Sequence, residues 1–156
     1  MPQPKRVGHL VLNVKDVEAS AKFYTQVLGF DISVKRPDGS ATFLTCGEIH
    51  HDLALFKAPE GAEPIKPGAL GLNHFAVQVA DFEALKEVYQ SLKEHGVKVQ
   101  RTVDHGMTGS VYFSDPDGNG IEFFFDKFEN PADGLAEIRR PGRKNTELAL
   151  EEVAVS

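Results

Sequence analysis

The chain has 156 residues and a formal net charge of -6, enough length for one well-packed domain or two small fused modules. Its acidic balance, with no Lys/Arg cluster before the tail, argues against nucleic acid or an anionic membrane as the main partner and favours a small molecule. The single cysteine, Cys46, cannot form an internal disulfide and is expected in the core. The N-terminus lacks the apolar run of a secretory signal, and no segment is apolar for long enough to cross a bilayer, so a cytoplasmic protein is expected.

The first half of the chain reads as one strand, one helix and three short strands. Residues 6–14 (RVGHLVLNV) alternate in polarity and predict a strand with His9 on one face. Asp16 is a helix N-cap, and the apolar stripe after it predicts a helix that Gly29 ends. Turn signals then separate three predicted strands, at 32–35, 42–46 and 51–56.

The second half repeats the first after a proline-rich linker at 58–69. Six residue pairs share a separation of 65 positions: His9/His74, Val14/Val79, Asp16/Asp81, Glu18/Glu83, Ala19/Ala84 and Tyr24/Tyr89. The repeat predicts a strand at 71–79, a helix from Asp81 to near Gly96, and strands at 97–103, 110–113 and 121–125. The sequence therefore predicts an α+β protein of two β-α-β-β-β modules, at about 5–57 and 70–127.

The most informative segment is 103–125 (VDHGMTGSVYFSDPDGNGIEFFF), which predicts a hairpin with a tight turn. Its return strand carries one carboxylate, Glu122, between Ile121 and Phe123. A carboxylate that points into the core is costly unless a cation, a metal or a proton compensates it. The alternative is that Glu122 faces solvent on an edge strand.

The repeat suggests how a metal site is assembled. If the first strands of the two modules lie side by side about a pseudo-twofold axis, His9 and His74 converge, and Glu122 meets them from the last strand. Two histidines and one carboxylate, with free positions opposite, form the ligand set of Fe(II) centres that activate dioxygen. A single histidine in a strand is more often a polar core or surface residue than a ligand. The equivalent repeat positions of His9 and His74, together with Glu122, favour ligands.

An alignment of the two module ends, Phe125 with Phe56, indicates whether the first module supplies a further metal ligand. It sets Leu53 opposite Glu122, so that symmetry supplies no fourth protein ligand. The same alignment leaves His51 two residues earlier on the same face.

The two-module layout with His9, His74 and Glu122 resembles the vicinal oxygen chelate superfamily. That superfamily includes glyoxalase I, extradiol dioxygenases, and fosfomycin- and bleomycin-resistance proteins. The resemblance covers about residues 5–127. It implies one domain, 1–128, in which the paired modules form a cup-shaped mixed β-sheet with the helices outside.

Within that superfamily, two segments resemble the type I extradiol ring-cleaving dioxygenases. The segment HDLAL at 51–55 is similar to the one that carries that family's catalytic histidine. The signature of the family is matched by a longer run, through His105, Val111, Tyr112, Asp115, Pro116, Gly118 and Glu122.

The resemblance implies Fe(II), or less often Mn(II), held by His9, His74 and Glu122. The substrate would be a catechol-type aromatic diol, such as catechol or a 2,3-dihydroxybiphenyl, cleaved with dioxygen. Single-domain members of the family are often oligomers, so a homo-oligomer is expected.

Three further residues receive catalytic roles from the resemblance. His51 is implied to hydrogen-bond dioxygen and then to donate a proton, since an imidazole can donate and accept near neutral pH. Tyr112 is implied to hydrogen-bond a ring oxygen, and His105 to steady the substrate hydroxyl.

Two other functions stay open. A glyoxalase I-like isomerase or lyase would need a fourth ligand, from His51 or Asp52, and predicts Ni(II) or Zn(II), a thiol and no need for oxygen. A metal-free, antibiotic-sequestering protein predicts that binding survives the loss of His9 or His74.

The tail, 129–156, lies outside the resemblance. A basic cluster of Arg139, Arg140, Arg143 and Lys144 precedes residues 146–153 (TELALEEV), which predict one amphipathic helix after a threonine cap. The tail is expected either to be solvated or to pack on a neighbouring subunit.

Overall fold

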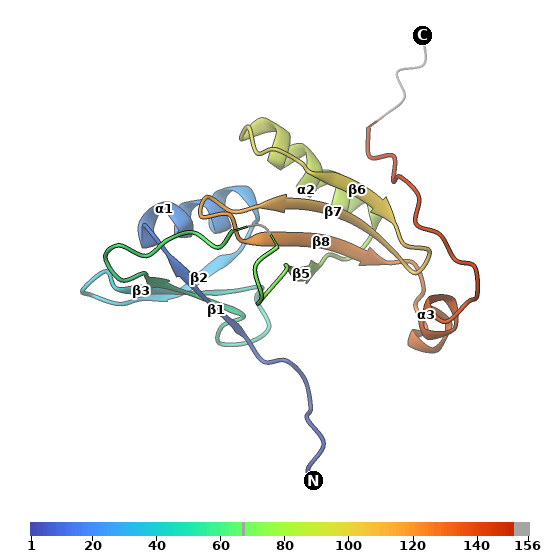
Figure 1. The fold of residues 1–156 in the computed structure, drawn as a ribbon, viewed down its shortest axis with the longest axis horizontal. Helices are drawn as coiled ribbons and strands as arrows, with labels where there is room; N and C mark the ends of the chain where they lie inside the picture. The colour runs from blue at the N-terminus through green and yellow to red at the C-terminus, as the bar shows by residue number, and fades with distance from the viewer. Residues whose placement is uncertain (67, 152–156) are drawn as a thin grey trace. The chain divides into compact units, whose positions relative to one another are not determined.

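The computed structural model of the protein describes residues 1–66 and 68–151. The chain divides into two compact units, Met1–Pro64 and Ile65–Ser156. Each unit contains one four-stranded sheet of mixed direction, as the sequence repeat predicts (Figure 1). No helix in the described part of the chain is long and apolar enough to cross a membrane.

The first unit has the predicted β-α-β-β-β order. Its elements are β1 (Leu10–Val14), α1 (Val17–Lys22), a π-helical turn (Phe23–Val27), β2 (Asp31–Lys35), β3 (Ala41–Thr45) and β4 (Leu53–Lys57). The strand order is β1-β4-β3-β2, and only the β1–β4 pair is parallel. Asp16 caps α1 as predicted, since its Oδ1 accepts the N–H of Ala19 at 3.0 Å.

One face of the first sheet is core and the other is exposed only in part. Fully buried Val14, Leu44 and Leu55 share the core with Tyr24 of the π-helical turn. Strand pairing aligns a second row on the opposite face: Val11, Ala54, Phe43 and Val34. The two ends of that row are more than half exposed, Val11 at 53% and Val34 at 55%, whereas Ala54 between them is 1% exposed, so this face is accessible only at its ends.

The second unit repeats the arrangement and adds a C-terminal helix. Its elements are β5 (Phe75–Gln78), α2 (Phe82–Glu94), β6 (Arg101–Asp104), β7 (Thr108–Ser114), β8 (Gly120–Asp126) and α3 (Pro131–Ile138). The strand order is β5-β8-β7-β6, with β5 and β8 parallel. Leu85 and Leu92 of α2 are fully buried, so this helix covers the core side of the unit.

Four of the strands, β1, β4, β5 and β6, start later than the sequence suggested. β1 begins at Leu10, whose N–H donates to the carbonyl of Asp52 at 2.9 Å, and the preceding residues from Arg6 have no strand partner among the described residues. His9 and His74 therefore lie one residue before β1 and β5, and His51 lies two residues before β4. The alternation of polar and apolar residues continues beyond the residues that pair with another strand. A sequence pattern does not show where the partner strand ends.

The strand register corrects the module alignment by one residue. Val11 pairs with Ala54, and its repeat equivalent, Ala76, pairs with Glu122. The structural counterpart of Glu122 is thus Ala54, and Leu53, 2% exposed, points into the core. A shift of one residue reverses the face of every side chain in a strand, and alignment of the aromatic ends could not detect it. Ala54, like Leu53, supplies no ligand atom.

Two predictions about single segments are wrong. Cys46 is exposed, in the turn after β3, and does not belong to the core. Residues 146–151 do not form a helix, because Thr146 pairs with Asp104 at the end of β6 and holds the tail extended; residues 152 and 153 of that predicted helix lie outside the described part. The helix of the tail is instead α3, which Asn130 caps and Pro131 begins.

Candidate functional site

The second unit brings four of the predicted site residues into one hydrogen-bonded cluster. β7 pairs with β8 so that Tyr112 lies directly opposite Glu122. Tyr112 Oη donates to Glu122 Oε1 at 2.8 Å, and His105 Nε2 lies 2.8 Å from the same phenol oxygen. On the other side of the carboxylate, His74 Nε2 lies 3.0 Å from Glu122 Oε2. The hydrogen bonds link these residues in the order His105, Tyr112, Glu122 and His74. We call these four residues the carboxylate cluster.

Tyr112 has a fixed role in the carboxylate cluster. Burial, together with the hydrogen bond and the negative charge of Glu122, raises the pKa of Tyr112 to about 12. The phenol therefore keeps its proton at neutral pH and donates a hydrogen bond to Glu122. The phenol oxygen can then accept a hydrogen bond, which places the N–H of His105 on Nε2. The guanidinium of Arg101 lies 4.2 Å from the centre of the Tyr112 ring and covers that ring from β6.

His74 is oriented so that it presents a lone pair to Glu122. Its Nδ1 lies 2.7 Å from Asn73 Oδ1, an acceptor, so Nδ1 carries the ring proton. In the neutral imidazole, Nε2 is then an acceptor that faces a carboxylate oxygen, also an acceptor. Glu122 is mostly buried, with 12% of its side chain exposed. Two acceptors this close need a cation, either a proton or a metal ion, and imidazole plus carboxylate suit a divalent transition metal.

Gly120 allows the close approach of His74 to β8. A Cβ on Gly120 would lie 2.6 Å from the carbonyl oxygen of Asn73 and 3.1 Å from Cβ of His74. Since real side chains do not tolerate the first distance, only glycine lets the segment before β5 lie this near to Glu122. Gly120 belongs to the turn composition that predicted the hairpin, but no sequence pattern indicates this contact, which depends on tertiary packing.

The first unit contains a second cluster, of histidines. The rings of His9 and His51 have centroids 4.5 Å apart, and those of His50 and His51 are 4.4 Å apart. Phe43, from β3, contacts the His51 ring edge-on, and the two ring centroids are 5.3 Å apart. Desolvation, followed by the influence of His50 and His9, lowers the pKa of His51, which favours its neutral form at neutral pH.

The six predicted site residues are thus divided between the units. His9 and His51 belong to the first unit, and the carboxylate cluster belongs to the second. Neither unit alone gathers three His, Cys, Asp or Glu side chains as a metal site among its described residues. Of the predicted ligand pairs, the structure brings His74 and Glu122 together.

Three residues near the carboxylate cluster were not assigned a role from the sequence. They are Asn73, Arg101 and Arg143. The hairpin formed by the strands predicted at 97–103 and 110–113 could have placed Arg101 beside Tyr112, had its register been worked out. Asn73 and Arg143 left no such signal, since their contacts depend on tertiary packing.

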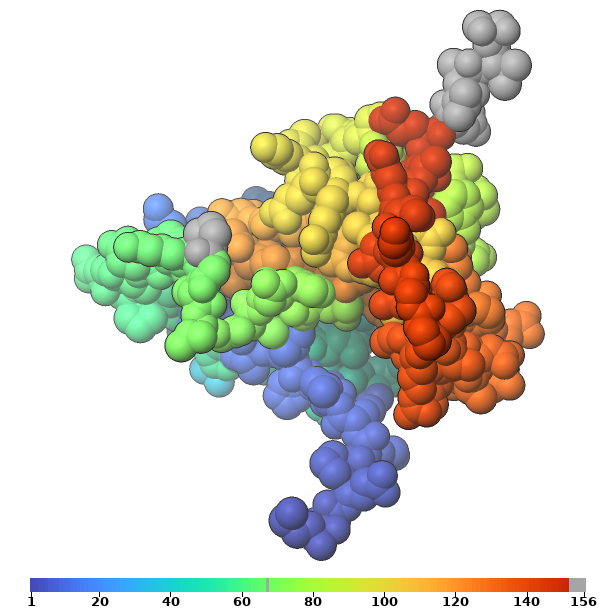
Figure 2. Space-filling model, turned by 45° about the vertical axis from the view of Figure 1, so that its right-hand side comes forward, coloured from blue at the N-terminus to red at the C-terminus, as the bar shows by residue number. Residues whose placement is uncertain are grey.

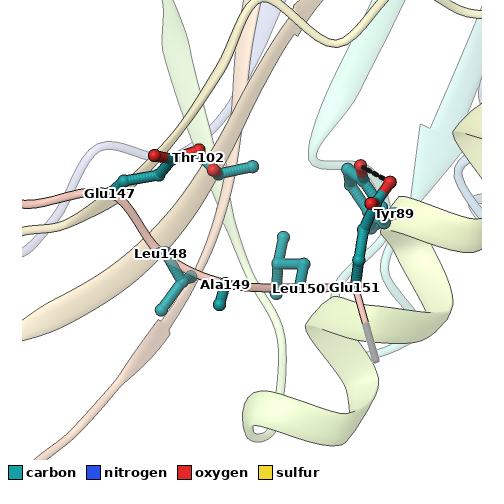
Figure 3. Close-up of a pocket in the computed structure, with 7 residues that line it drawn as sticks. All are labelled: Tyr89, Thr102, Glu147, Leu148, Ala149, Leu150 and Glu151. Carbon is teal, nitrogen blue, oxygen red and sulfur yellow. Dashed lines mark hydrogen bonds between the residues drawn. The ribbon is translucent and has the colours of Figure 1, made fainter. Parts of the chain in front are cut away.

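A pocket of about 480 Å³ lies in the same unit but apart from this cluster. Its lining includes Tyr89 of α2, Thr102 of β6 and tail residues 147–151 (Figure 3). Tyr89 Oη donates to Glu151 Oε1 at 3.0 Å across one end. None of its lining residues belongs to the carboxylate cluster, so this pocket is a feature of how the tail packs.

Comparison with known proteins relates this geometry to a family. The family model of the glyoxalase/bleomycin resistance protein/dioxygenase superfamily matches residues 6–123. Biphenyl-2,3-diol 1,2-dioxygenase 2 of Rhodococcus globerulus is 36% identical over 141 residues, which cover 90% of this chain and 73% of that protein. Biphenyl-2,3-diol 1,2-dioxygenase 3 of the same organism is 36% identical over 127 residues, or 81% of this chain and 66% of that protein.

A solved structure agrees with the sequence comparisons. A glyoxalase/dioxygenase from Nostoc punctiforme has a TM-score of 0.69 and 25% identity, covering 80% of this chain and 92% of that one. The repeated four-stranded units, the family match and these relatives lead to one conclusion. The chain belongs to the glyoxalase/bleomycin resistance protein/dioxygenase superfamily.

Proposed function

We propose that the protein is a non-haem Fe(II)-dependent extradiol dioxygenase that cleaves the ring of a catechol-type substrate with dioxygen. The observation that carries the proposal is the carboxylate cluster, in which one carboxylate lies between an imidazole nitrogen and a phenol donor. The names of the two Rhodococcus relatives support an aromatic diol, catechol or a 2,3-dihydroxybiphenyl, as the substrate. The superfamily also includes glyoxalases and resistance proteins, so membership alone does not assign a function. The choice among these functions rests on the chemistry of the site.

The proposed metal ligands are His74, Glu122 and, from the first unit, His9. The facing acceptor atoms of His74 and Glu122 fit a divalent cation, and Fe(II) or, less often, Mn(II) is proposed. When bound, the metal supplies Lewis-acid activation of the diol and a template for the two reactants. The carbon–carbon bond beside one hydroxyl breaks and both oxygen atoms enter the product. The diol supplies all four electrons, so no external reductant is needed.

The chain's own residues hold protons at defined places for this reaction. Tyr112 keeps its proton, so it orients Glu122 and presents its oxygen to donors. His105 donates from Nε2 to that oxygen and retains Nδ1 as an acceptor, suited to a substrate hydroxyl. His51, whose lowered pKa favours the neutral imidazole, can accept a proton and return it as the ring opens.

The test is oxygen uptake by protein reconstituted with Fe(II) under anaerobic conditions. Catechol, substituted catechols and 2,3-dihydroxybiphenyl are added with air, and the yellow ring-opened product is followed by absorbance. We expect one oxygen consumed per product in the wild type, and loss of both signals in Glu122→Gln. Glu129→Gln, an equal charge change at an exposed position of the same unit, is the matched control.

An absence of oxygen uptake by protein shown to contain Fe(II) would contradict the proposal. Thiol-dependent turnover with Ni(II) or Zn(II), without oxygen, would assign the site to isomerase or lyase chemistry instead. Ligand binding that persists in His74→Ala without metal would indicate a sequestering protein.

A further inference from the structure

The β6–β7 turn carries His105 and is built to be rigid. The N–H of His105 donates to the carbonyl of Thr108 at 2.9 Å, which closes the turn. Gly106 has a φ of 85° and donates its N–H to Asp104 Oδ1 at 2.8 Å. Lys127, just after β8, pairs with the other carboxylate oxygen of Asp104. The turn is thus fixed within the sheet before the tail is considered.

The tail then attaches to this turn at two neighbouring residues. Thr146 and Asp104 exchange both backbone hydrogen bonds, at 2.8 and 3.0 Å. Arg143 Nη1 donates to the backbone carbonyl of His105 itself, and to Asn145 Oδ1 at 3.0 Å. Figures 1 and 2 show the red tail running beside the yellow β6 segment. The tail therefore contacts the main chain on both sides of the His105 N–H.

A third contact comes from α3. A Cβ on Gly106 would lie 2.6 Å from Glu137 Oε1, so the last turn of α3 lies directly against the residue after His105. Glu137 is itself held by Arg140, whose guanidinium donates to both carboxylate oxygens at 2.8 and 2.9 Å. Beyond the turn, Leu150 is 6% exposed, so the tail is anchored by burial as well.

We propose that the tail, through Arg143, is a positioning element for His105. The inference rests on the proposed ring-cleavage function, in which His105 meets the substrate. The imidazole of His105 is held to the other members of the carboxylate cluster by one hydrogen bond, to Tyr112 at 2.8 Å, so its position depends strongly on its own main chain. Arg143 holds the carbonyl of that residue with a charged donor, and loss of the donor leaves the carbonyl with one partner fewer. Arg143 touches no reacting atom and is a positioning residue.

The first test uses nuclear magnetic resonance of the full-length, metal-free protein. The variant is Arg143→Gln, and the control is Arg139→Gln, an equal charge change four residues earlier whose side chain has no described contact with the turn. We expect the ring nitrogen signals of His105 and the amide signals of 104–106 to shift in Arg143→Gln. They should stay in place in Arg139→Gln. Unchanged His105 signals in Arg143→Gln would overturn the inference.

The second test is a double-mutant cycle on kcat with a ring-cleavage substrate. Arg143→Gln is expected to lower kcat about tenfold with His105 present and less than twofold in a His105→Gln background. KM should change little, and Arg143→Lys should restore part of kcat because it retains a charged donor. Equal losses of kcat in both backgrounds would mean that Arg143 acts on the fold and not through His105.

The two tests separate this inference from the proposed function. Shifted His105 signals together with a wild type that cleaves no diol would reject the function and retain the tail as an anchor of the turn. An active wild type with unshifted signals would reject the anchor and retain the function.

Discussion

Tyr112 joins the two halves of the carboxylate cluster, and its single oxygen serves both neighbours. It donates to Glu122 and accepts from His105, each at 2.8 Å. With a pKa of about 12, the phenol does not release its proton at any pH at which the enzyme would be assayed. The direction of both hydrogen bonds is therefore fixed. Substitution of Tyr112 by phenylalanine removes the hydroxyl and both bonds while it retains the ring.

We expect Tyr112→Phe to lower kcat 10- to 100-fold while the bound iron content stays at the wild-type level. The ring volume is retained, so the free energy of unfolding should fall by only about 1–3 kcal/mol for the two lost hydrogen bonds. Stopped-flow kinetics, iron analysis and urea unfolding measure the three quantities. Tyr89→Phe, which removes a hydroxyl bonded to Glu151 away from the cluster, is the control. A wild-type kcat in Tyr112→Phe would refute the role of the phenol.

Gly120→Ala tests whether the close approach of His74 matters. The new methyl group would meet the carbonyl of Asn73 at 2.6 Å, and so force the segment that carries His74 away from β8. We predict a loss of Fe(II) affinity of tenfold or more, read by competition with a chelator. Gly134→Ala, where a Cβ meets nothing within 4 Å, should bind iron like the wild type. Equal affinities in both variants would show that the approach is dispensable.

At the scale of elements, local signals predicted better than long-range ones. Both helices with an aspartate cap start where the sequence indicated, because the cap acts within one turn. The tail was misassigned for the opposite reason: Thr146 fits a helix cap locally but pairs with Asp104, more than forty residues away in the chain. The start of α3 also has a local signal, an asparagine cap at Asn130 followed by proline at the first helical position.

The attachment of the tail should weaken in acid. Arg140 holds the pKa of Glu137 below its ordinary value, and Lys93 with Tyr89 does the same for Glu151. For Asp104, desolvation raises the pKa, but Lys127 and the N–H of Gly106 outweigh it, so the pKa is lowered. Carboxyl groups with lowered pKa values stabilise the fold above their unfolded pKa, and this contribution disappears as pH falls through the folded pKa.

The ordinary values are 4.5 for glutamate and 3.8 for aspartate, so the loss begins below about pH 4.5 and continues to lower pH. Hydrogen exchange, corrected for intrinsic rates, should show lower protection of the amides of Thr146 and Asp104 at pH 3 than at pH 6. The amides of buried Leu85 and Leu92 in α2 serve as the internal reference. Constant protection of Thr146 over this range would show that the carboxylates do not hold the tail.

At the scale of the whole chain, the repeat carried most of the predictive power. A constant separation of 65 residues predicted two units with the same strand order, and the structure has them. The same repeat set His9 and His74 at equivalent positions, and each lies one residue before the first strand of its unit. Their role as ligands stays a prediction. The repeat could not predict the contacts of Asn73, whose equivalent position in the first module is Gly8, or those of Arg143, which lies beyond the second module.

The proposed ligands come from both units, His9 from the first and His74 and Glu122 from the second, so each histidine can be tested separately for metal binding. A ligand that binds only the folded protein stabilises it by about 2.7 kcal/mol at a free concentration 100 times its Kd. In a chain of this size, that corresponds to a rise in Tm of about 5–10 °C. We expect anaerobic Fe(II) to produce this rise in the wild type and in His95→Ala, and a chelator to reverse it. His9→Ala and His74→Ala should each abolish it. A rise that survives in His9→Ala but not in His74→Ala would mean that the second unit binds the metal without help from the first.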